Sequence, residues 1–262
     1  MQLDLSGRHA LVCAASHGIG KASALELAQL GADVTVLARS PDALREVAQN
    51  LPRTHAEQQH RWRAVDMLDT FALQAAATDL SALSPVHILI NNSGGPPGGP
   101  THSADPATFE AAFRQHLLGG QVLVQALLPG MRAHGYGRIV NVISTSVKEP
   151  IMGLGVSNTV RGAIANWAKS LAGELAADGI TVNNVLPGYT RTQRLNDLLG
   201  ASAQARGLSE QEVMQDMLAS VPARRFGEAH EVAAVIAFLC SPAASYVNGV
   251  NIPVDGGRTR SL

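Results

Sequence analysis

The sequence predicts an α/β fold in which helices pack on both faces of one parallel sheet of seven strands, a doubly wound sandwich. Short apolar runs alternate along the chain with longer segments whose apolar residues recur at helical spacing. Most of the short runs are continuously apolar, which is typical of strands buried on both faces. Strands and helices that alternate in this way form parallel sheets with right-handed crossovers. The chain has 262 residues, and we expect 1–262 to form a single domain.

Each element follows from this alternation. The expected strands cover residues 9–14, 33–38, 59–65, 86–91, 137–143, 181–186 and 250–254. The expected helices cover residues 18–30, 41–50, 70–83, 106–134, 155–177 and 230–240. Residues 93–101 are rich in glycine and proline and therefore predict a loop. Residues 190–222 form a long polar insertion with helical pieces, and we expect residues 192–222 to act as a lid.

Composition narrows the function classes. Hydrophobic residues make up 46% of the chain and charged residues 16%, which is ample for a buried core. Lys and Arg number 20 against 21 Asp and Glu, and this balance argues against a nucleic-acid partner. Two cysteines, Cys13 and Cys240, suit a reducing compartment and predict neither a disulfide framework nor a metal site. No membrane span or signal peptide is evident, so we expect a cytoplasmic protein without a membrane partner.

The first expected strand runs into a glycine turn, and a helix follows directly. Glycine permits the tight turn and lets a ligand approach the backbone closely. The unpaired N–H groups in the first turn of the helix favour a pyrophosphate at this point. Strand, turn, helix and second strand at the right distance predict a Rossmann-type dinucleotide site. The residues expected to bind the cofactor here are Ser16, His17, Gly18, Ile19 and Gly20.

The end of the second expected strand indicates which dinucleotide is bound. NAD-binding proteins place an acid here on the ribose hydroxyls, whereas an arginine suits the 2′-phosphate of NADP. Ala38 occupies the position of the acid, Arg39 follows it, and Ser40 adds a hydroxyl. The sequence therefore predicts NADP(H) in preference to NAD(H), with Arg39 and Ser40 as ligands of the cofactor.

An ordered series of motifs resembles the short-chain dehydrogenase/reductase family, in the branch that includes the 3-oxoacyl-[acyl-carrier-protein] reductases. The matching pieces extend over nearly the whole chain: Gly18-Ile19-Gly20, Asp66, Asn91-Asn92-Ser93-Gly94, residues 137–141, residues 179–183, Pro187-Gly188 with Thr192, and residues 254–257. The resemblance implies further cofactor-binding residues on both halves of the dinucleotide. They are Asp66 and Met67 at the adenine, Asn91, Asn92 and Gly94 along the adenosine ribose, and Pro187, Gly188, Thr190 and Thr192 at the nicotinamide.

One position of the glycine turn departs from the family. Relatives usually begin the turn with Thr-Gly, where this chain has Cys13 and Ala14. We expect the added methyl group at Ala14 to be tolerated, provided that its backbone stays in a commonly populated region. The closest approach to phosphate falls to later residues of the turn.

The resemblance also identifies the candidate catalytic residues, and three of the four differ from the family. Ser144 matches the serine that orients the substrate carbonyl. Ser157 stands in place of the proton-donating tyrosine, Arg161 in place of the lysine, and His116 in place of an asparagine. A serine hydroxyl is a far weaker acid than a phenol. Arg161 stays charged and can hold ribose hydroxyls or an acidic substrate group, but it cannot titrate as a base.

His116 has the only side chain of the four that ordinarily titrates near neutral pH, which makes it a candidate relay or general acid. A histidine within a helix is, however, more often a satisfied core residue. Arg191 and Arg194 could clamp an anionic substrate or could lie on a solvated face of the lid. Of the two tyrosines near these motifs, Tyr189 is expected to pack in the substrate pocket and Tyr136 to lie at the surface.

These observations favour an NADP(H)-dependent oxidoreductase that transfers hydride between the nicotinamide and a carbonyl or alcohol substrate, with an atypical proton donor. The alternative is a catalytically weak or inactive dinucleotide-binding protein that acts as a sensor or an assembly partner. A lyase or dehydratase on the same scaffold is a third reading, since a fold does not fix chemistry. The resemblance implies a homotetramer, and a homodimer stays open. The sequence does not identify the small-molecule substrate.

Overall fold

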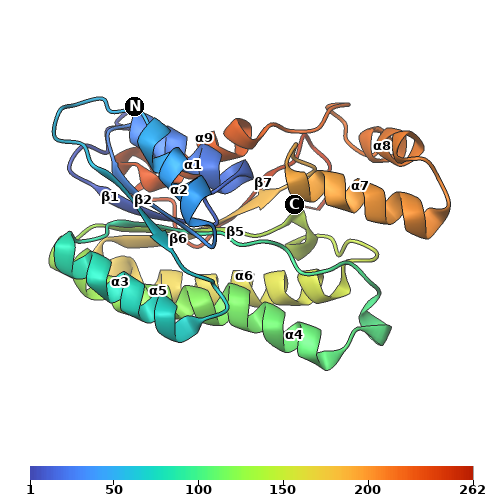
Figure 1. The fold of residues 1–262 in the computed structure, drawn as a ribbon, viewed down its shortest axis with the longest axis horizontal. Coiled ribbons are helices and arrows are strands. Elements are labelled where there is room, and N and C mark those ends of the chain that lie inside the picture. The colour runs from blue at the N-terminus through green and yellow to red at the C-terminus, as the bar shows by residue number, and fades with distance from the viewer. Residues whose placement is uncertain (262) are drawn as a thin grey trace.

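A computed structural model describes residues 1–261 and contains a seven-stranded sheet (Figure 1). The strands are all parallel and lie in the order β3-β2-β1-β4-β5-β6-β7. They are β1 (His9–Cys13), β2 (Asp33–Ala38), β3 (His60–Ala64), β4 (Ile88–Asn91), β5 (Gly137–Val142), β6 (Ile180–Pro187) and β7 (Asn251–Val254). The Rossmann-type fold predicted from the sequence is confirmed.

Helices cover both faces of this sheet (Figure 1). One face carries α1 (Gly18–Gln29), α2 (Pro41–Asn50) and α9 (Ala229–Cys240). The other carries α3 (Thr70–Leu83), α4 (Pro106–Phe113), α5 (Gly119–Ala133) and α6 (Gly155–Leu175). The segment expected to form a lid contains α7 (Gln193–Arg206) and α8 (Glu210–Ala219), which lie together at one end of the molecule.

The central strand β1 explains why the apolar runs are continuous. Its side chains alternate between the two faces of the sheet, as in any strand. Ala10 and Val12 belong to the core beneath α1, α2 and α9, whereas Leu11 and Cys13 belong to the core beneath α3, α5 and α6. All four side chains are completely buried, because each face is covered by helices.

The long helix expected over residues 106–134 is instead divided into α4 and α5. A turn of π-helix, Arg114–Leu118, lies between them and holds His116. Such a turn widens the helix by one residue, and sequence periodicity does not reveal it. Gly119 follows at a point where a Cβ would lie 3.1 Å from the carbonyl oxygen of Met67, so the chain passes close to the end of β3 here.

Tyr136 was expected at the surface, and this prediction is wrong. Its ring is 7% exposed, and its hydroxyl donates a hydrogen bond of 2.6 Å to the carbonyl oxygen of Cys240. The guanidinium groups of Arg8 and Arg138 lie 3.9 and 4.1 Å from the ring centroid. Tyr136 precedes β5, at the amino end of the sheet, and its role is to join α9 to that end.

Two further properties bear on the function classes. Among residues 1–261, no helix is both long enough and apolar enough to cross a membrane. The same part of the chain contains no cluster of three histidine, cysteine or carboxylate side chains that could hold a metal ion. Cys13 and Cys240 are free and buried. Burial raises the pKa of the Cys13 thiol to about 12, so that it stays protonated.

The strand order places a crevice at the carboxyl edge of the sheet. β1 lies between β2 and β4, so the chain leaves β1 towards one side and later returns to its other side. At such a switch point the loops that follow neighbouring strands diverge, and open α/β sheets bind their ligands in the resulting gap. The loops after β1, β4, β5 and β6 all begin at this edge.

Candidate active site

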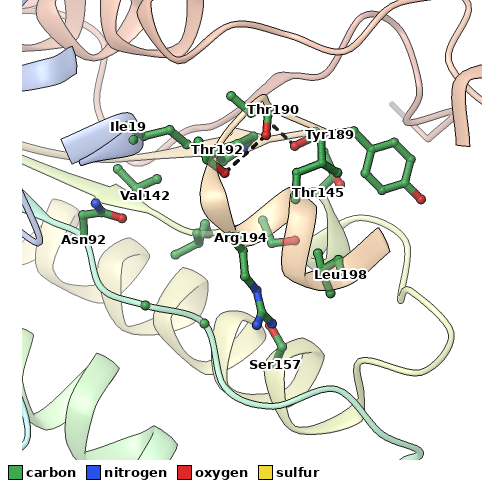
Figure 2. Close-up of a pocket in the computed structure, with 18 of the residues that line it drawn as sticks. Ile19, Asn92, Val142, Thr145, Ser157, Tyr189, Thr190, Thr192, Arg194 and Leu198 are labelled. Atoms are coloured by element: carbon green, nitrogen blue, oxygen red, sulfur yellow. Dashed lines mark hydrogen bonds between the residues drawn. The ribbon is translucent and has the colours of Figure 1, made fainter. Parts of the chain in front are cut away.

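A cavity of about 360 Å³ opens at the carboxyl edge of the sheet (Figure 2). Its size falls in the lower part of the range for small-molecule sites, roughly 300–1,000 Å³. The loops after β1, β4, β5 and β6 line it together with the first turns of α6 and α7. Among the residues predicted from the sequence, the lining includes His17, Gly18, Ile19, Asn92, Gly94, Ser144, Ser157, Arg161, Pro187, Gly188, Thr190 and Thr192.

The glycine turn forms one wall of the cavity. Gly18 has φ +57°, in the left-handed region that favours glycine. A Cβ on Gly20 would lie 2.3 Å from the carbonyl oxygen of Ala14, so no larger residue fits there. α1 begins at Gly18, and its N-cap residue His17 makes no side-chain hydrogen bond to the first turn. The N–H groups of that turn therefore have no side-chain cap and can receive an anion.

Ala14 does not have the ordinary backbone that the sequence led us to expect. Its φ is +49°, one of two positive values among the non-glycine residues described. An L-residue in this region costs about 1–2 kcal/mol, because its Cβ approaches the following carbonyl oxygen. The turn keeps the shape that a glycine would adopt at this position, and Ala14 bears the strain.

The residues predicted to bind the adenosine end of the cofactor also lie at the carboxyl edge of the sheet, after β2 and β3. Arg39 and Ser40 follow β2 and are both exposed, and Arg39 forms no ion pair within the described residues. Asp66 is half-buried, and its carboxylate accepts a 3.0 Å hydrogen bond from the N–H of Leu68. Met67, the next residue, is buried.

The side chain of Asn91 takes no part in this surface. It is 8% exposed and donates to the side chain of Asn141 at 2.9 Å. Asn141 donates in turn to Asn184 at 2.8 Å, and Asn184 to Asn251 at 2.7 Å, so that one amide from each of β4 to β7 joins a row across the sheet. The Asn91 side chain is therefore a link in this row, and any contact of this residue with a ribose would fall to its backbone.

The segment after β6 closes the cavity from above. The hydroxyl of Thr190 donates to the carbonyl oxygen of Gly188 at 3.2 Å, and that of Thr192 to the carbonyl oxygen of Thr190 at 3.3 Å (Figure 2). A Cβ on Gly18 would meet the Thr192 methyl group at 3.3 Å. Gly188 in turn lies where a Cβ would be 2.6 Å from that of Asp255. These contacts place Thr192 against the glycine turn and Gly188 against Asp255, which follows β7.

Three of the four predicted catalytic side chains meet in the cavity. Ser144 follows β5, and its hydroxyl oxygen accepts a 3.1 Å hydrogen bond from the N–H of Ser146, which leaves its proton free to donate. Ser157 and Arg161 lie one turn apart on α6, so they share a face of that helix. Both are buried, at 9% and 7% exposure.

His116 lies behind this cavity. It borders a separate void of about 10 Å³, shared with Asn91, Asn92 and Arg161, which is about the size of one water molecule. Its Nδ1 pairs with the hydroxyl of Ser93, and its Nε2 has no hydrogen-bond partner among the described residues. Burial first, and then the charges of Arg161 and Arg194, lower the pKa of His116 to about 2. The ring is therefore neutral, which disfavours the general-acid role considered from the sequence.

Arg161 remains a cation in spite of its burial. Burial, with a smaller contribution from Arg194, lowers its pKa to about 10. Its Nη1 donates a 2.9 Å hydrogen bond to the carbonyl oxygen of Val142, which fixes the guanidinium at the end of β5. Such a group can donate to ribose or substrate oxygens and cannot act as a base near neutral pH.

The two arginines considered as a clamp are separated in the structure. Arg194 lines the cavity, and its side chain extends from the start of α7 towards Ser157 (Figure 2). Arg191 instead forms an exposed ion pair of 3.0 Å with Glu228. Tyr189 lines the cavity as expected, and it stacks edge-on against Phe226 with ring centroids 6.1 Å apart.

Sequence reasoning missed Arg258, which also lines the cavity. Its guanidinium lies 4.6 Å from the Tyr189 ring centroid, and its Nη1 is 3.4 Å from the hydroxyl of Thr145. The signal was available in the sequence: Arg258 follows the last strand by four residues, and parallel strands end at the same edge of the sheet.

Comparison with known proteins places this geometry in context. The family described as "Enoyl-(Acyl carrier protein) reductase" matches residues 13–259. The NADPH-dependent reductase BacG of Bacillus subtilis is 30% identical over 98% of this chain and 100% of its own length. Protein FixR of Bradyrhizobium diazoefficiens is 35% identical over 95% of this chain and 85% of its own. The crystal structure of L-sorbose reductase from Gluconobacter frateurii, complexed with NADPH and L-sorbose, superposes with a TM-score of 0.92 at 28% identity and covers both chains fully.

Proposed function

The chain belongs to the short-chain dehydrogenase/reductase family, and from that premise we propose that it is an NADP(H)-dependent oxidoreductase acting on the carbonyl or alcohol group of a small molecule. The observation that carries the proposal is the convergence of Ser144, Ser157 and Arg161 on one cavity with the glycine turn. A protein that only bound a dinucleotide would have no use for two hydroxyls, half-buried Ser144 and buried Ser157, that line the same cavity as that turn.

The geometry of the glycine turn fits a bound dinucleotide. Gly20 leaves no room for a Cβ, and Gly94 on the facing loop has open space around it, so backbone lines the cradle on both sides. The uncapped first turn of α1 favours the pyrophosphate. Arg39, without an ion pair among residues 1–261, favours a 2′-phosphate. The NADPH-dependent reductase BacG and the structure of L-sorbose reductase complexed with NADPH agree with this preference. When bound, the cofactor supplies or accepts the hydride.

The remaining steps fall to the side chains of the cavity. Ser144 donates a hydrogen bond to the carbonyl oxygen of the substrate, since its own oxygen already accepts from Ser146. Ser157 supplies a second donor beside it. Arg161 holds the ribose hydroxyls, and its positive charge stabilises the negative charge that develops on the substrate oxygen as hydride is transferred. A buried cation is more effective in this role than a solvated one.

The proton is the unusual part of this mechanism. Neither Arg161 nor neutral His116 releases one near neutral pH, and Ser157 lacks the acidity of a phenol. We assign the proton to water that reaches the cavity. General acid catalysis contributes about 10²–10⁴-fold to such reactions, so turnover is expected to be slow by that factor relative to an enzyme with a tyrosine in this place.

The alternative is a dinucleotide-binding protein with weak or no catalysis. The lack of a side chain that donates a proton near neutral pH, seen for Ser157, Arg161 and His116, favours this alternative. One experiment separates the two. Oxidation of NADPH is followed with a panel of ketones, quinones and oxo acids, using the Gly18→Asp variant as the control that cannot hold the cofactor. Turnover by the wild type and not by the control supports the enzyme. Tight NADPH binding by fluorescence, with no turnover of any compound, supports the binding protein.

We also propose that the protein assembles as a homotetramer or homodimer, as its family resemblance suggests. Apolar side chains left exposed on the single chain support this, among them Phe71 at 83% and Leu118 at 44% exposure. Light scattering at several protein concentrations measures the assembly directly, and a monomer at all of them would contradict it.

A further inference from the structure

Positively charged side chains outnumber carboxylates in the lining of the cavity. Three guanidinium groups line it, those of Arg161, Arg194 and Arg258, against the single carboxylate of Asp197, which is exposed to solvent. Neither Arg161 nor Arg194 has a carboxylate within 4.0 Å in the described part of the chain. An unpaired cation that is buried costs free energy, so such a site favours an anion as its ligand.

Other arginines in and near the same segment show that this is a property of the cavity. Arg191 pairs with Glu228, Arg206 with Asp216 and Arg225 with Glu231, at N–O distances of 3.0, 2.5 and 2.6 Å. These three are exposed. Exposed Arg224 instead donates to the carbonyl oxygen of Ala219, and Arg194, which points inward, has no acid at ion-pair distance among the described residues.

Arg194 is held in a position from which it can bind a ligand. Its Nη2 donates a 2.7 Å hydrogen bond to the carbonyl oxygen of Pro96, on the loop after β4. Gly95 permits this placement, since a Cβ there would lie 3.1 Å from Nη2. The other donors of the planar fork stay available, and that fork matches a carboxylate through two parallel hydrogen bonds. The Arg194 guanidinium lies beside Ser157 (Figure 2). An anionic group bound there would be a few bonds from the substrate carbonyl that Ser157 contacts.

The cofactor does not account for this charge. Its pyrophosphate belongs at the uncapped start of α1 and its 2′-phosphate beside Arg39 after β2, and each of these places supplies its own donors. Arg161 serves ribose hydroxyls, which carry no charge. The positive field at this point is evident at His116, where both Arg161 and Arg194 contribute to lowering the pKa of the ring.

We propose that the substrate is a compact oxo acid or hydroxy acid whose carboxylate is bound by Arg194, with Arg161 as a second positive charge behind it. This rests on the proposed function. In the reductive direction hydride from NADPH forms a C–H bond at the carbonyl carbon, the electron pair of the C=O bond moves to oxygen, and that oxygen takes a proton from water. The products are the hydroxy acid and NADP⁺. The cavity of about 360 Å³ has to receive the nicotinamide as well as the substrate, which favours a compact substrate.

The test compares charged and neutral forms of the same substrates. Pyruvate, 2-oxobutyrate and acetoacetate are assayed beside their methyl esters and beside dihydroxyacetone phosphate, with NADPH and three proteins: wild type, Arg194→Gln and Arg191→Gln. Arg191 is the matched control because it lies on the same segment and outside the cavity. Calorimetry of oxalate binding to NADP⁺-loaded protein measures the anion site without turnover, and melting temperatures verify folding.

We expect the wild type to use at least one oxo acid at least ~10-fold better than its ester. Arg194→Gln should weaken acid and oxalate binding by about 10- to 100-fold, the effect of losing a charged hydrogen-bonded pair, while Arg191→Gln changes neither. Esters used as well as acids, a preference for the phosphate, or oxalate binding unchanged in Arg194→Gln would overturn the proposal. Oxalate binding that depends on Arg194 without oxidation of NADPH by any compound would leave the anion site in place and refute the hydride-transfer function.

Discussion

Replacing Ala14 by glycine should stabilise the protein, although alanine-to-glycine changes usually do the opposite. Ala14 has φ +49°, which costs an L-residue about 1–2 kcal/mol and costs glycine almost nothing. Glycine gains conformational freedom in the unfolded chain, which offsets about 0.5–1 kcal/mol of this. The net gain is about 0.5–1 kcal/mol in the free energy of unfolding, or an increase of about 1–4 °C in melting temperature for a chain of this size.

Thermal unfolding of Ala14→Gly beside Ala43→Gly measures this effect. Ala43 lies in the first turn of α2, so its replacement should lower stability by up to about 1 kcal/mol, the cost of glycine in a helix interior. The two variants remove the same methyl group and differ in the backbone beneath it. A melting temperature of Ala14→Gly that falls together with that of Ala43→Gly would refute the assignment of strain to this position.

Three further predictions concern the site. Arg39→Ala should reduce the preference for NADPH over NADH by about 10- to 100-fold in the ratio of kcat/KM values, because a charged hydrogen bond to the 2′-phosphate is lost; an unchanged ratio would show that the cofactor prediction is wrong. Ser144→Ala should lower kcat by about 10²–10³-fold while the Kd of NADPH stays within twofold or so, since one donor to the developing oxyanion is removed; an equal loss of cofactor binding would assign Ser144 a structural role. His116 should make the protein acid-sensitive: its pKa is about 2 in the folded state and 6.5 ordinarily, so the unfolded chain binds a proton that the folded chain does not. The free energy of unfolding is therefore unaffected by this group above pH 6.5 and falls as the pH drops below that value, by about 2 kcal/mol at pH 5. Urea unfolding above pH 6.5 and at pH 5 should show a smaller difference between the two conditions for His116→Asn than for the wild type.

The sequence predicted the sheet well because burial on both faces leaves a direct mark on composition. Each of the seven expected strands lies within about two residues of an observed one, and the continuous apolar runs, such as that of β1, identified the doubly covered layer. Ser144, Ser157 and Arg161 were assigned to one site through the resemblance to the family, and all three line the same cavity. These features are local, or they follow from the order of elements.

The features that were missed depend on contacts between distant parts of the chain. Arg191 and Arg194 lie one turn of chain apart, yet Arg194 donates to Pro96, 98 residues away, whereas Arg191 pairs with Glu228. The neutral state of His116 arises from burial and from two arginines on other elements. Tyr136 is buried by its bond to Cys240, 104 residues further along the chain. Neither periodicity nor spacing carries such information.

The central claim is that this cavity transfers hydride from NADPH to a carbonyl carbon. The most direct measurement uses NADPH that carries deuterium at the reactive carbon of the nicotinamide, incubated with the substrate panel, followed by mass spectrometry of the products. We predict a hydroxy product with one deuterium on the carbon that bears the hydroxyl group, formed by the wild type and not by Gly18→Asp. Tight NADPH binding without any deuterated product from the whole panel would contradict the account.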